Sequence, residues 1–356
     1  MEMERGSLNL RRLSLAQLES FFEEMGEARY RGGQVFRRLH RHRSRHFDEF
    51  TELPKALRAR LRESTSLAGA VVEHRAIDSS GTEKFILDVS GAEGDRFPAA
   101  SQRVEAVWIV SPKRCTICVS CQSGCSLDCS FCATGAMAFA GNLEPWQILE
   151  QVYVLEELRA QRATNVVFMG MGEPFHNYDS VMAAAHVLSS SDGTGLGVRK
   201  ITISTAGVLP GIERFTREEQ PFRLAVSLNH SDSRGRSEIM SINERYPLAD
   251  LVEAARRYTA ASGHRITFEY VMIDGVNLDR GHLRKLVAIA RSMPCKINLI
   301  PLNTDLPGMR RPSREQAERF QRQLAESGIA VFNRGSPGRE VGAACGMLAL
   351  DRLSTS

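Results

Sequence analysis

Hydrophobic and polar residues follow different periods in successive parts of this chain. Between residues 13 and 65 apolar positions recur at helical spacing, and Ser14 stands where the N-cap of a first helix is expected. A further helix is predicted after Thr51, with Pro54 in its first turn. From about residue 68 to 110 the pattern changes to short β-rich runs, at residues 70–77, 84–91 and 104–111. The sequence therefore predicts a helical segment followed by a small β region.

From residue 115 onward, strand-like apolar runs alternate with helix-like segments. The apolar runs lie at residues 116–120, 165–169, 200–204, 222–228, 266–272 and 296–301. The helix-like segments lie around residues 144–160, 178–190, 248–262, 280–292 and 313–327. A strand followed by a helix, repeated about six times, indicates a parallel β/α architecture with fewer units than the closed barrel of eight. We expect a partial (β/α)6 barrel whose functional residues lie at the carboxyl ends of its strands.

The fold class predicted from these patterns is α/β, in three regions. Residues 1–67 form a helical accessory domain, residues 68–112 a small β linker region, and residues 113–356 the partial barrel with a C-terminal cysteine loop. A chain of 356 residues is long enough for more than one domain, so this division agrees with its length.

Composition and charge exclude some classes of protein. No apolar run approaches the roughly 18 residues that a membrane span needs, and the N-terminus has no apolar signal core. We therefore expect a cytoplasmic protein with no membrane partner. The net charge is only +4, yet seven arginines lie between Arg29 and Arg45. Such a cluster favours binding to a phosphate backbone, although a solvated helix face would show the same pattern.

Six of the eight cysteines fall between Cys115 and Cys132, which points to metal or redox chemistry rather than to a disulfide framework. Cys125, Cys129 and Cys132 form C-x3-C-x2-C directly after the first strand of the β/α repeat. Three thiolates on one loop can hold three irons of a [4Fe–4S] cluster and leave the fourth iron for a non-protein ligand. The alternative is a zinc site with Cys121 as fourth ligand. The first spacing of three residues, without a second CxxC or HxxH pair, favours iron–sulfur.

The spacing C-x3-C-x-Phe-C, with Phe131 before the last cysteine, resembles the motif of radical S-adenosylmethionine (SAM) enzymes. The sequence FMGMGEP at residues 168–174 resembles the Gly-Gly-Glu-Pro motif of that superfamily, which contacts the amino group of SAM. This resemblance implies a [4Fe–4S] cluster that binds SAM at its open iron. It also implies that one electron from the cluster cleaves SAM to methionine and a 5′-deoxyadenosyl radical.

Further motifs resemble the RlmN/Cfr family of RNA adenine methyltransferases. They are CVSCQSGC with Cys118, AACGML with Cys345, VEAV at 104–107, ITIST at 201–205 and NLIPLN at 298–303. The segments GEARYRGGQVFRRLH and FTELPKALRARL are similar to the accessory RNA-binding domain of that family, so residues 1–67 are expected to bind RNA. The resemblance covers nearly the whole chain.

The resemblance implies methylation of an adenosine ring carbon, most of all C2, in 23S rRNA, with tRNA as a further candidate substrate. Cys345 would take a methyl group from one SAM, and the radical from a second SAM would activate it for addition to the adenine. Cys118 would then attack the sulfur of Cys345 and release the RNA through a transient disulfide. Glu105 matches the base that removes the proton. A reducing electron donor such as flavodoxin or ferredoxin is implied, and we expect a monomer.

The resemblance also implies a set of SAM contacts. They are Gly172, Glu173, Ser204, Ser227, Leu228, Asn229 and Asn303. One position departs from the family, which usually has Ser-Leu-His where this chain has Ser-Leu-Asn. Asn keeps one donor and one acceptor, so a polar contact can survive the change.

Several alternatives stay open at this point. The chain could be a divergent radical SAM methyltransferase acting on another RNA position, including adenine C8, or on a non-RNA substrate. It could also be a non-catalytic RNA-binding iron–sulfur protein, although binding alone would not need Glu105, Cys118 and Cys345. Taken singly, Cys118 and Cys345 could be buried structural thiols and Glu105 a solvent-facing strand residue. Cys115, Cys121 and Cys295 are expected to be small buried residues.

Overall fold

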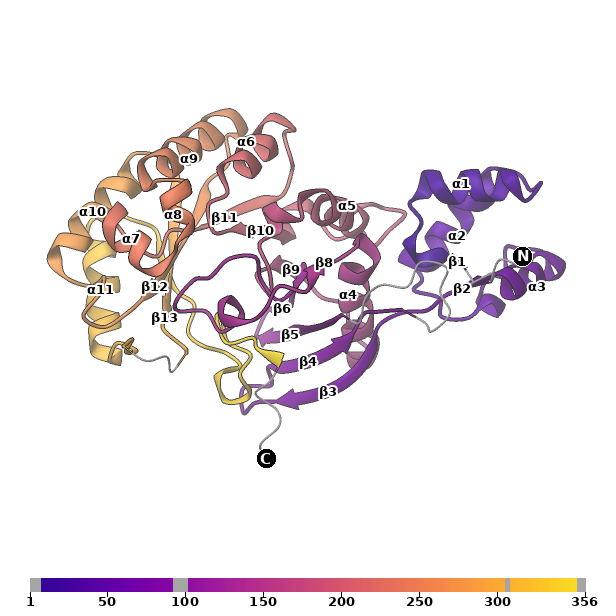
Figure 1. Ribbon diagram of the computed structural model, residues 1–356, viewed down its shortest axis with the longest axis horizontal. Helices are drawn as coiled ribbons and strands as arrows, with labels where there is room; N and C mark the ends of the chain where they lie inside the picture. The colour runs from indigo at the N-terminus through magenta and orange to yellow at the C-terminus, as the bar shows by residue number, and fades with distance from the viewer. Residues whose placement is uncertain (1–7, 92–101, 305–307, 351–356) are drawn as a thin grey trace.

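One mixed sheet organises the barrel part of the molecule. In the computed structural model, which describes residues 8–91, 102–304 and 308–350, a single sheet contains ten strands. Its parallel strands are β6 (Arg114–Val119), β9 (Asn165–Phe168), β10 (Ile201–Thr205), β11 (Arg223–Ser227), β12 (Ile266–Met272), β13 (Cys295–Pro301) and β14 (Val331–Asn333). Each pairs with the next in that order, with β14 at one edge of the sheet, so the parallel part is an open, partial barrel (Figure 1).

The helices between these strands cover the sheet. They are α4 (Pro145–Arg159), α5 (Tyr178–Ser189), α6 (Leu209–Arg217), α7 (Ser233–Ile239), α8 (Ile242–Arg245), α9 (Leu248–Ser262), α10 (Arg280–Arg291) and α11 (Arg314–Glu326). The predicted α/β class and all six predicted parallel strands are confirmed. In the described ranges, no helix combines the length and the apolar character that crossing a bilayer requires.

The edge strand and three helices of the barrel were not predicted, and the sequence signal of each is weak. Strand β14 has only three residues, which is too short for an alternating pattern, and α7 and α8 are short polar helices. Helix α6 begins Leu-Pro-Gly, a sequence typical of a turn. Proline is tolerated in a first helical turn, and a side chain at Gly211 would lie 2.5 Å from the Phe175 side chain. Close packing therefore requires glycine inside this helix.

The predicted small β region extends the barrel sheet. Its strands are β3 (Val71–Ile77), β4 (Glu83–Asp88) and β5 (Arg103–Ser111), and β5 pairs antiparallel with β6. Strand β3 is therefore the second edge of the ten-stranded sheet. Because β4 is buried along nearly its whole length, residues of this region can contribute to a site inside the barrel.

The N-terminal helices have a hydrophobic core of their own. They are α1 (Leu15–Glu24), α2 (Tyr30–His40) and α3 (Lys55–Ser64), with a two-stranded pair formed by β1 (Leu8–Asn9) and β2 (Thr65–Ser66). Ser14 caps α1 as predicted, in a capping box with Gln17. Pro54 immediately precedes α3 rather than lying in its first turn. These helices form a lobe beside α4 and α5 (Figure 1).

Buried ion pairs join this lobe to α4. Arg11 and Arg45 contact opposite oxygens of Glu150 at 2.7 and 2.5 Å, and Arg43 contacts Glu156. The Arg11 and Glu150 side chains are 2% and 1% exposed, so this pair is fully desolvated. Nearby, His40 is hydrogen-bonded to Tyr153 at 2.9 Å, and burial lowers the pKa of His40 to about 3.

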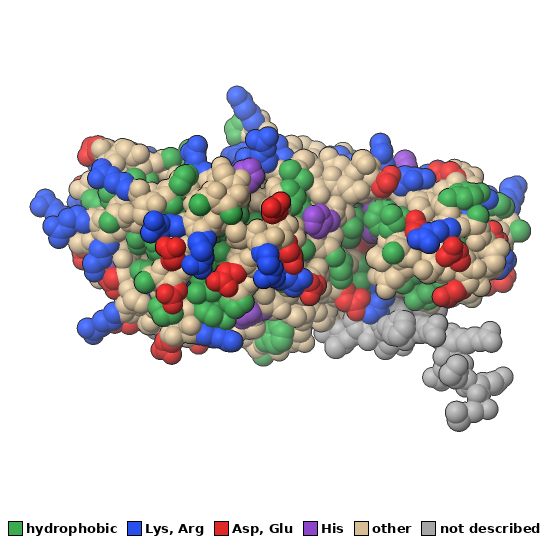
Figure 2. Space-filling model, turned by 90° about the horizontal axis from the view of Figure 1, so that it is seen from above, with side chains coloured by type: hydrophobic (Ala, Val, Ile, Leu, Met, Phe, Trp, Pro, Cys, Tyr) green, Lys and Arg blue, Asp and Glu red, His purple; other side chains and the backbone are tan. Residues whose placement is uncertain are grey.

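The arginine-rich segment 29–45 is therefore only partly available to a ligand. Besides Arg43 and Arg45, Arg29 pairs with Glu19 at 2.8 Å and Arg38 with Glu52 at 2.6 Å. On the face shown in Figure 2, basic side chains of the lobe alternate with acidic ones. Several guanidinium groups of the segment therefore hold the fold together, and the expected contact with a phosphate backbone falls to the remaining ones.

We predict that Glu150→Gln destabilises the protein far more than the same change at an exposed pair. The substitution removes the carboxylate that pairs with the buried Arg11 and one of the two that pair with Arg45, and breaking a buried pair costs about 3–5 kcal/mol. The matched control is Glu238→Gln, whose partner Arg234 is exposed, and it should cost less than about 1 kcal/mol. Urea unfolding of both variants measures the difference. Equal, small losses would contradict the structural role of Glu150.

Candidate active site

The predicted site residues gather at the carboxyl ends of the parallel strands. The cysteine loop follows β6, Gly172 and Glu173 follow β9, and Ser204 is the last residue but one of β10. Ser227 ends β11, with Leu228 and Asn229 after it, and Asn303 follows β13. Because neighbouring parallel strands end at the same edge of a sheet, segments far apart in sequence meet here.

The cysteine loop is a compact turn whose three thiols lie close together. The amide of Leu127 donates to the sulfur of Cys125 at 3.4 Å, and the amide of Cys132 donates to the carbonyl of Cys129 at 3.0 Å. Burial raises the pKa of Cys125 to about 11 and that of Cys129 further, and the neighbouring thiols add to both shifts. Three crowded thiols ionise readily only beside a strong positive charge, so this donor set fits an iron–sulfur cluster.

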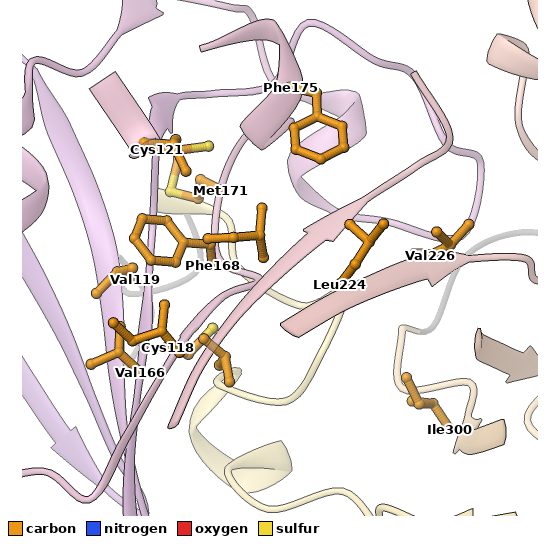
Figure 3. Close-up of a cluster of buried hydrophobic side chains, with 14 of the residues drawn as sticks. Cys118, Val119, Cys121, Val166, Phe168, Met171, Phe175, Leu224, Val226 and Ile300 are labelled. Carbon is orange, nitrogen blue, oxygen red and sulfur yellow. The ribbon is translucent and has the colours of Figure 1, made fainter. Parts of the chain in front are cut away.

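Cys121 lies outside this turn. It is 2% exposed and belongs to the hydrophobic core, where Met171 and Phe168 lie near it (Figure 3). The side-chain amide of Asn177 donates to its carbonyl at 2.8 Å, which fixes the backbone before the loop begins. Desolvation raises the pKa of its thiol well above the usual value. This environment is that of a small core residue.

The turn after β9 requires glycine and holds a buried carboxylate. Gly172 has φ of +98°, and a Cβ there would lie 2.5 Å from that of Gln122. The Glu173 carboxylate accepts from the amides of Phe175 at 2.9 Å and Ala206 at 2.7 Å, yet burial raises its pKa to about 7. A carboxylate held at the strand ends in this way is suited to bind an ammonium group.

Arg236, which the sequence patterns did not single out, joins the ends of β10 and β11. Its fully buried guanidinium donates to the carbonyls of Ala206 at 2.5 Å, Leu228 at 3.2 Å and Ser227 at 3.3 Å. Burial lowers its pKa to about 10, while the thiol of Cys129 acts in the opposite direction, which puts the guanidinium near the cysteine loop. It lies in SRGRSE, a polar run that gives no sign of burial.

The backbone explains why Asn suits position 229. Asn229 has φ of +57°, in the left-handed region that Asn adopts more readily than most residues. Its side-chain oxygen accepts from the amide of Val271 at 3.0 Å, and its carbonyl accepts from Asn277 at 2.8 Å. The Asn in place of the family's usual His therefore ties the end of β11 to that of β12.

Asn303 holds the C-terminal cysteine loop. Its side-chain nitrogen donates to the carbonyl of Cys345 at 3.0 Å, while its oxygen accepts from Arg311 at 2.7 Å and Ser336 at 2.5 Å. The amide of Ala133 also donates to the carbonyl of Gly346 at 2.7 Å. The C-terminal segment thus lies against the loop that carries the three clustered cysteines (Figure 1).

This docking brings together two cysteines that are remote in the sequence. Cys118 lies on β6, and burial raises its pKa to about 12, with a further contribution from Cys345. Cys345 is exposed as a residue, yet desolvation of its thiol raises the pKa to about 11. The guanidinium of Arg334 lowers the pKa of both thiols, so it lies near both of these potential nucleophiles. No sequence motif pointed to Arg334.

Glu105 is buried on β5, so the alternative that it faces solvent is wrong. Its side chain is 0% exposed and forms an ion pair with Lys84 of β4, at 3.1 Å between Nζ and Oε1. Desolvation raises the pKa of Glu105 above its ordinary value, and Lys84 opposes that shift. A buried carboxylate with a raised pKa is a candidate general base.

Another group of potential metal ligands lies nearby, but its carboxylate is already used. His230, Asp232 and His282 place donor atoms within 4.8 Å of one another. Asp232 accepts from the Lys285 ammonium at 3.0 Å and from the amide of Gly235 at 2.9 Å. These contacts make the group a tie between the loop after β11 and α10.

Comparison with known proteins places these features in a family. Residues 119–287 match the model of the radical SAM superfamily, and residues 8–67 match that of the ribosomal RNA large subunit methyltransferase N-terminal domain. The chain is 45% identical to a probable dual-specificity RNA methyltransferase RlmN of Leptospira biflexa, over 94% of each chain. It is 38% identical to the dual-specificity RNA methyltransferase RlmN of Pseudomonas fluorescens, over 98% of this chain and 92% of that one.

A solved structure agrees with these sequence matches. The crystal structure of a radical SAM methyltransferase from Sphaerobacter thermophilus superposes with a TM-score of 0.88 and 38% identity. The match covers 96% of this chain and 99% of that one, so it includes both the N-terminal lobe and the barrel.

We predict that Cys125→Ala, Cys129→Ala and Cys132→Ala each abolish cluster absorbance and reductive SAM cleavage after anaerobic reconstitution. Each change removes one of the three thiols that crowd in the loop. The matched control is Cys121→Ala, which lies in the core and should keep both properties. Full cluster content in any of the three variants, or loss in the control alone, would show that the ligand assignment is wrong. Iron and sulfide analysis with the visible spectrum measures the outcome.

Proposed function

This chain belongs to the RlmN family of radical SAM RNA methyltransferases, and on that premise we propose that it methylates carbon 2 of an adenosine in 23S rRNA. We propose tRNA as a further substrate, because the relatives carry names that include a dual specificity. The observation that carries the proposal is the meeting of Cys118 and Cys345 beside one cationic side chain, Arg334.

The cysteine loop and the neighbouring strand ends are the proposed cofactor site. Cys125, Cys129 and Cys132 would hold a [4Fe–4S] cluster that, with SAM bound, supplies an electron and a 5′-deoxyadenosyl radical. The Glu173 carboxylate, fixed by two backbone amides, would accept from the amino group of SAM. Gly172, Ser204, Ser227, Leu228, Asn229 and Asn303 complete the proposed contacts. The side chains of Asn229 and Asn303 already hold the protein's own backbone, so their contribution is to shape the site.

The chain's own residues carry the proposed methyl transfer. An aromatic ring carbon is a poor nucleophile, whereas a thiolate attacks a methyl sulfonium readily. Cys345 would take the methyl group as a thiolate, favoured by Arg334, and the methylthio group would lose one hydrogen atom to the radical before its carbon bonds to the adenine. Glu105 would accept the proton from the substituted ring carbon, and one electron would return to the cluster. Cys118 would then attack the sulfur of Cys345: the disulfide would form as the bond from that sulfur to the methylene carbon breaks, and that carbon would take up a proton as the methylated RNA leaves.

The N-terminal lobe is the proposed RNA-holding domain. Arg37 on α2 and Arg41, the residue after that helix, remain accessible. Arg37 lies 3.8 Å from the Asp192 carboxylate, and Arg41 donates to the carbonyl of Ser191 at 2.9 Å. The target base would leave its stack and enter the barrel mouth, as enzymes that act on bases require. We further propose that the protein is a cytoplasmic monomer and that it receives electrons from a donor such as flavodoxin or ferredoxin.

The direct test is nucleoside analysis after a reaction with reconstituted protein, SAM, a reductant and 23S rRNA or tRNA. The expected product is 2-methyladenosine, identified by mass spectrometry against standards of both ring-methylated isomers. Formation of 8-methyladenosine would replace the C2 assignment by C8. The absence of any methylated nucleoside from a protein that cleaves SAM would show that RNA is not the substrate.

We predict that Cys118→Ala traps RNA on the protein. Methyl transfer to Cys345 and addition to the adenine do not need Cys118, but release does, because no thiolate remains to attack the thioether sulfur. A denaturing gel should show a protein–RNA band, and peptide mass spectrometry should locate a methylene bridge at Cys345.

Two further variants control this result. Cys118→Ala combined with Cys345→Ala should give no band, because no sulfur carries the methyl group. Cys295→Ala, at a partly buried thiol on β13, should turn over normally. Free methylated RNA at normal yield from Cys118→Ala, or a band that persists without Cys345, would defeat the proposed mechanism.

We predict that Arg37→Glu with Arg41→Glu weakens RNA affinity and reduces its dependence on salt. Each lost phosphate contact lowers the slope of log K against log salt by about 1. Cleavage of SAM without RNA should not change. Arg314→Glu, on the exposed face of α11, is the control. Filter binding between about 50 and 200 mM salt gives the slope, and an unchanged slope would exclude the lobe's second helix from the RNA interface.

A further inference from the structure

Lys84 is a buried cation whose ion-pair partner is the proposed base. Its side chain is 1% exposed and that of Glu105 is 0% exposed, and the two are 3.1 Å apart. Burying a lysine costs several kcal/mol in free energy unless an opposite charge compensates it. Each of these two buried charges therefore depends on the other. The neighbouring Glu83 contacts Arg75 and Arg159 instead, both at 2.6 Å.

The register of the sheet sets Lys84 and Glu105 on one face, together with Cys118. Lys84 lies opposite Val107 and Ile86 opposite Glu105 across the β4–β5 pair. Residues directly opposite each other share a face, so Lys84 and Glu105 are diagonal neighbours within reach of a long side chain. Cys118 lies opposite Val107 on the other side of β5 and therefore shares this face. The alternation of each strand thus puts the ion pair beside a proposed catalytic thiol.

The C-terminal segment packs against the Lys84–Glu105 pair. A Cβ added at Gly342 would lie 3.2 Å from the Lys84 ammonium nitrogen, three residues before Cys345. Four residues after Cys345, the backbone of Ala349 is close enough to Glu105 to lower its pKa. Lys84 and Glu105 therefore contact the segment on both sides of the proposed methyl carrier.

We propose that Lys84 is a positioning residue for the methylation reaction: its ammonium keeps Glu105 ionised and aimed beneath the Cys345 loop until the ring proton is transferred. This inference rests on the proposed function, because it takes Glu105 as the base. The inference adds to the proposed function a role for Lys84, which belongs to neither the cofactor site nor the thiol pair.

Two opposing effects set the pKa of Glu105 and determine the direction in which it moves when Lys84 is removed. Burial raises the pKa of the carboxyl group, and Lys84 is the charged group that lowers it. The other groups that the structure describes near Glu105 do not titrate near neutral pH. They are Met171, whose sulfur accepts from the Glu105 amide, Ser120, which donates to its carbonyl, the Ala349 backbone, and the Cys118 thiol, whose pKa burial raises to about 12. Without Lys84 the pKa of Glu105 rises further, and the base is protonated up to a higher pH.

The Lys84 ammonium also affects Glu105 after the proton transfer. When Glu105 accepts the proton it becomes neutral, and Lys84 is left buried without its counter-charge. That state is unfavourable, because breaking a buried pair exposes the full desolvation cost of the remaining ion. The same lysine that keeps the base ready therefore favours loss of the proton from Glu105 after transfer.

The test is the pH profile of single-turnover RNA methylation by reconstituted Lys84→Met. The acid limb of the profile, where the rate rises as Glu105 ionises, should move to higher pH. At a fixed pH on that limb, the rate of the variant should be lower than that of wild type by about tenfold for each pH unit of the shift. The rate should recover as the pH rises. Lys84→Arg keeps the charge and should keep the wild-type limb. Lys113→Met, at an exposed turn between β5 and β6, is the matched control and should leave the profile unchanged.

Readouts that precede the base step separate this role from a purely structural one. Cluster content, SAM cleavage without RNA and methylation of Cys345 should be normal in Lys84→Met. If that variant folds poorly, Lys84→Met with Glu105→Gln removes both charges and should restore these three properties but not RNA methylation. A Lys84→Met profile of wild-type shape, whether at full or at uniformly reduced rate, would overturn the inference.

The proposed function can fail separately. If wild-type protein forms no methylated nucleoside, the substrate assignment fails before Lys84 is tested. If wild type is active and Glu105→Gln is equally active, the base assignment fails and the role of Lys84 fails with it. A slow Glu105→Gln with an unchanged pH profile for Lys84→Met would overturn the inference alone.

Discussion

The site depends on one docking contact, between the C-terminal segment and the cysteine loop. The amide of Ala133 donates to the carbonyl of Gly346, and the Thr134 hydroxyl donates to that of Leu348 at 2.7 Å. Asn303 holds Cys345 itself from the end of β13. None of these bonds is strong alone, since each contributes about 1 kcal/mol, but together they determine where the Cys345 thiol lies. Without them the barrel would keep its strands and lose the meeting of Cys118 with Cys345.

Strand position explains much of the fold's predictability. Strand–helix alternation and the carboxyl-end rule placed Glu173 and Asn303 at one edge of a parallel sheet, because both follow directly from chain order. The cysteine spacing is likewise local, so it could be read without a structure. What could not be read is packing across long separations. Gly211 looks like a turn residue until Phe175 lies against it, and Arg236 looks exposed until three carbonyls surround its guanidinium.

Charged residues were the least predictable part, for a physical reason. A formal charge usually signals solvent, so Arg11, Arg43 and Lys84 read as surface residues. Each is instead compensated by a carboxylate from a distant element, namely Glu150, Glu156 and Glu105. Sequence shows that a charge exists but not whether an opposite charge will be buried with it. The arginine-rich lobe is the clearest example, because the same residues that suggest a nucleic-acid surface also fasten the lobe to α4.

The thiols of the site present a further electrostatic constraint. Burial raises the pKa of Cys118 to about 12 and that of Cys345 to about 11, so at neutral pH both are held as thiols rather than as nucleophilic thiolates. Arg334 moves both in the opposite direction, but its charge is shared with Glu269, whose carboxylate lies 3.6 Å away. A thiolate at Cys345 therefore needs additional positive charge beside it. A methyl donor that carries a sulfonium cation brings that charge with it, so nucleophile and substrate would become reactive at the same moment, and an idle site would keep its cysteines protonated.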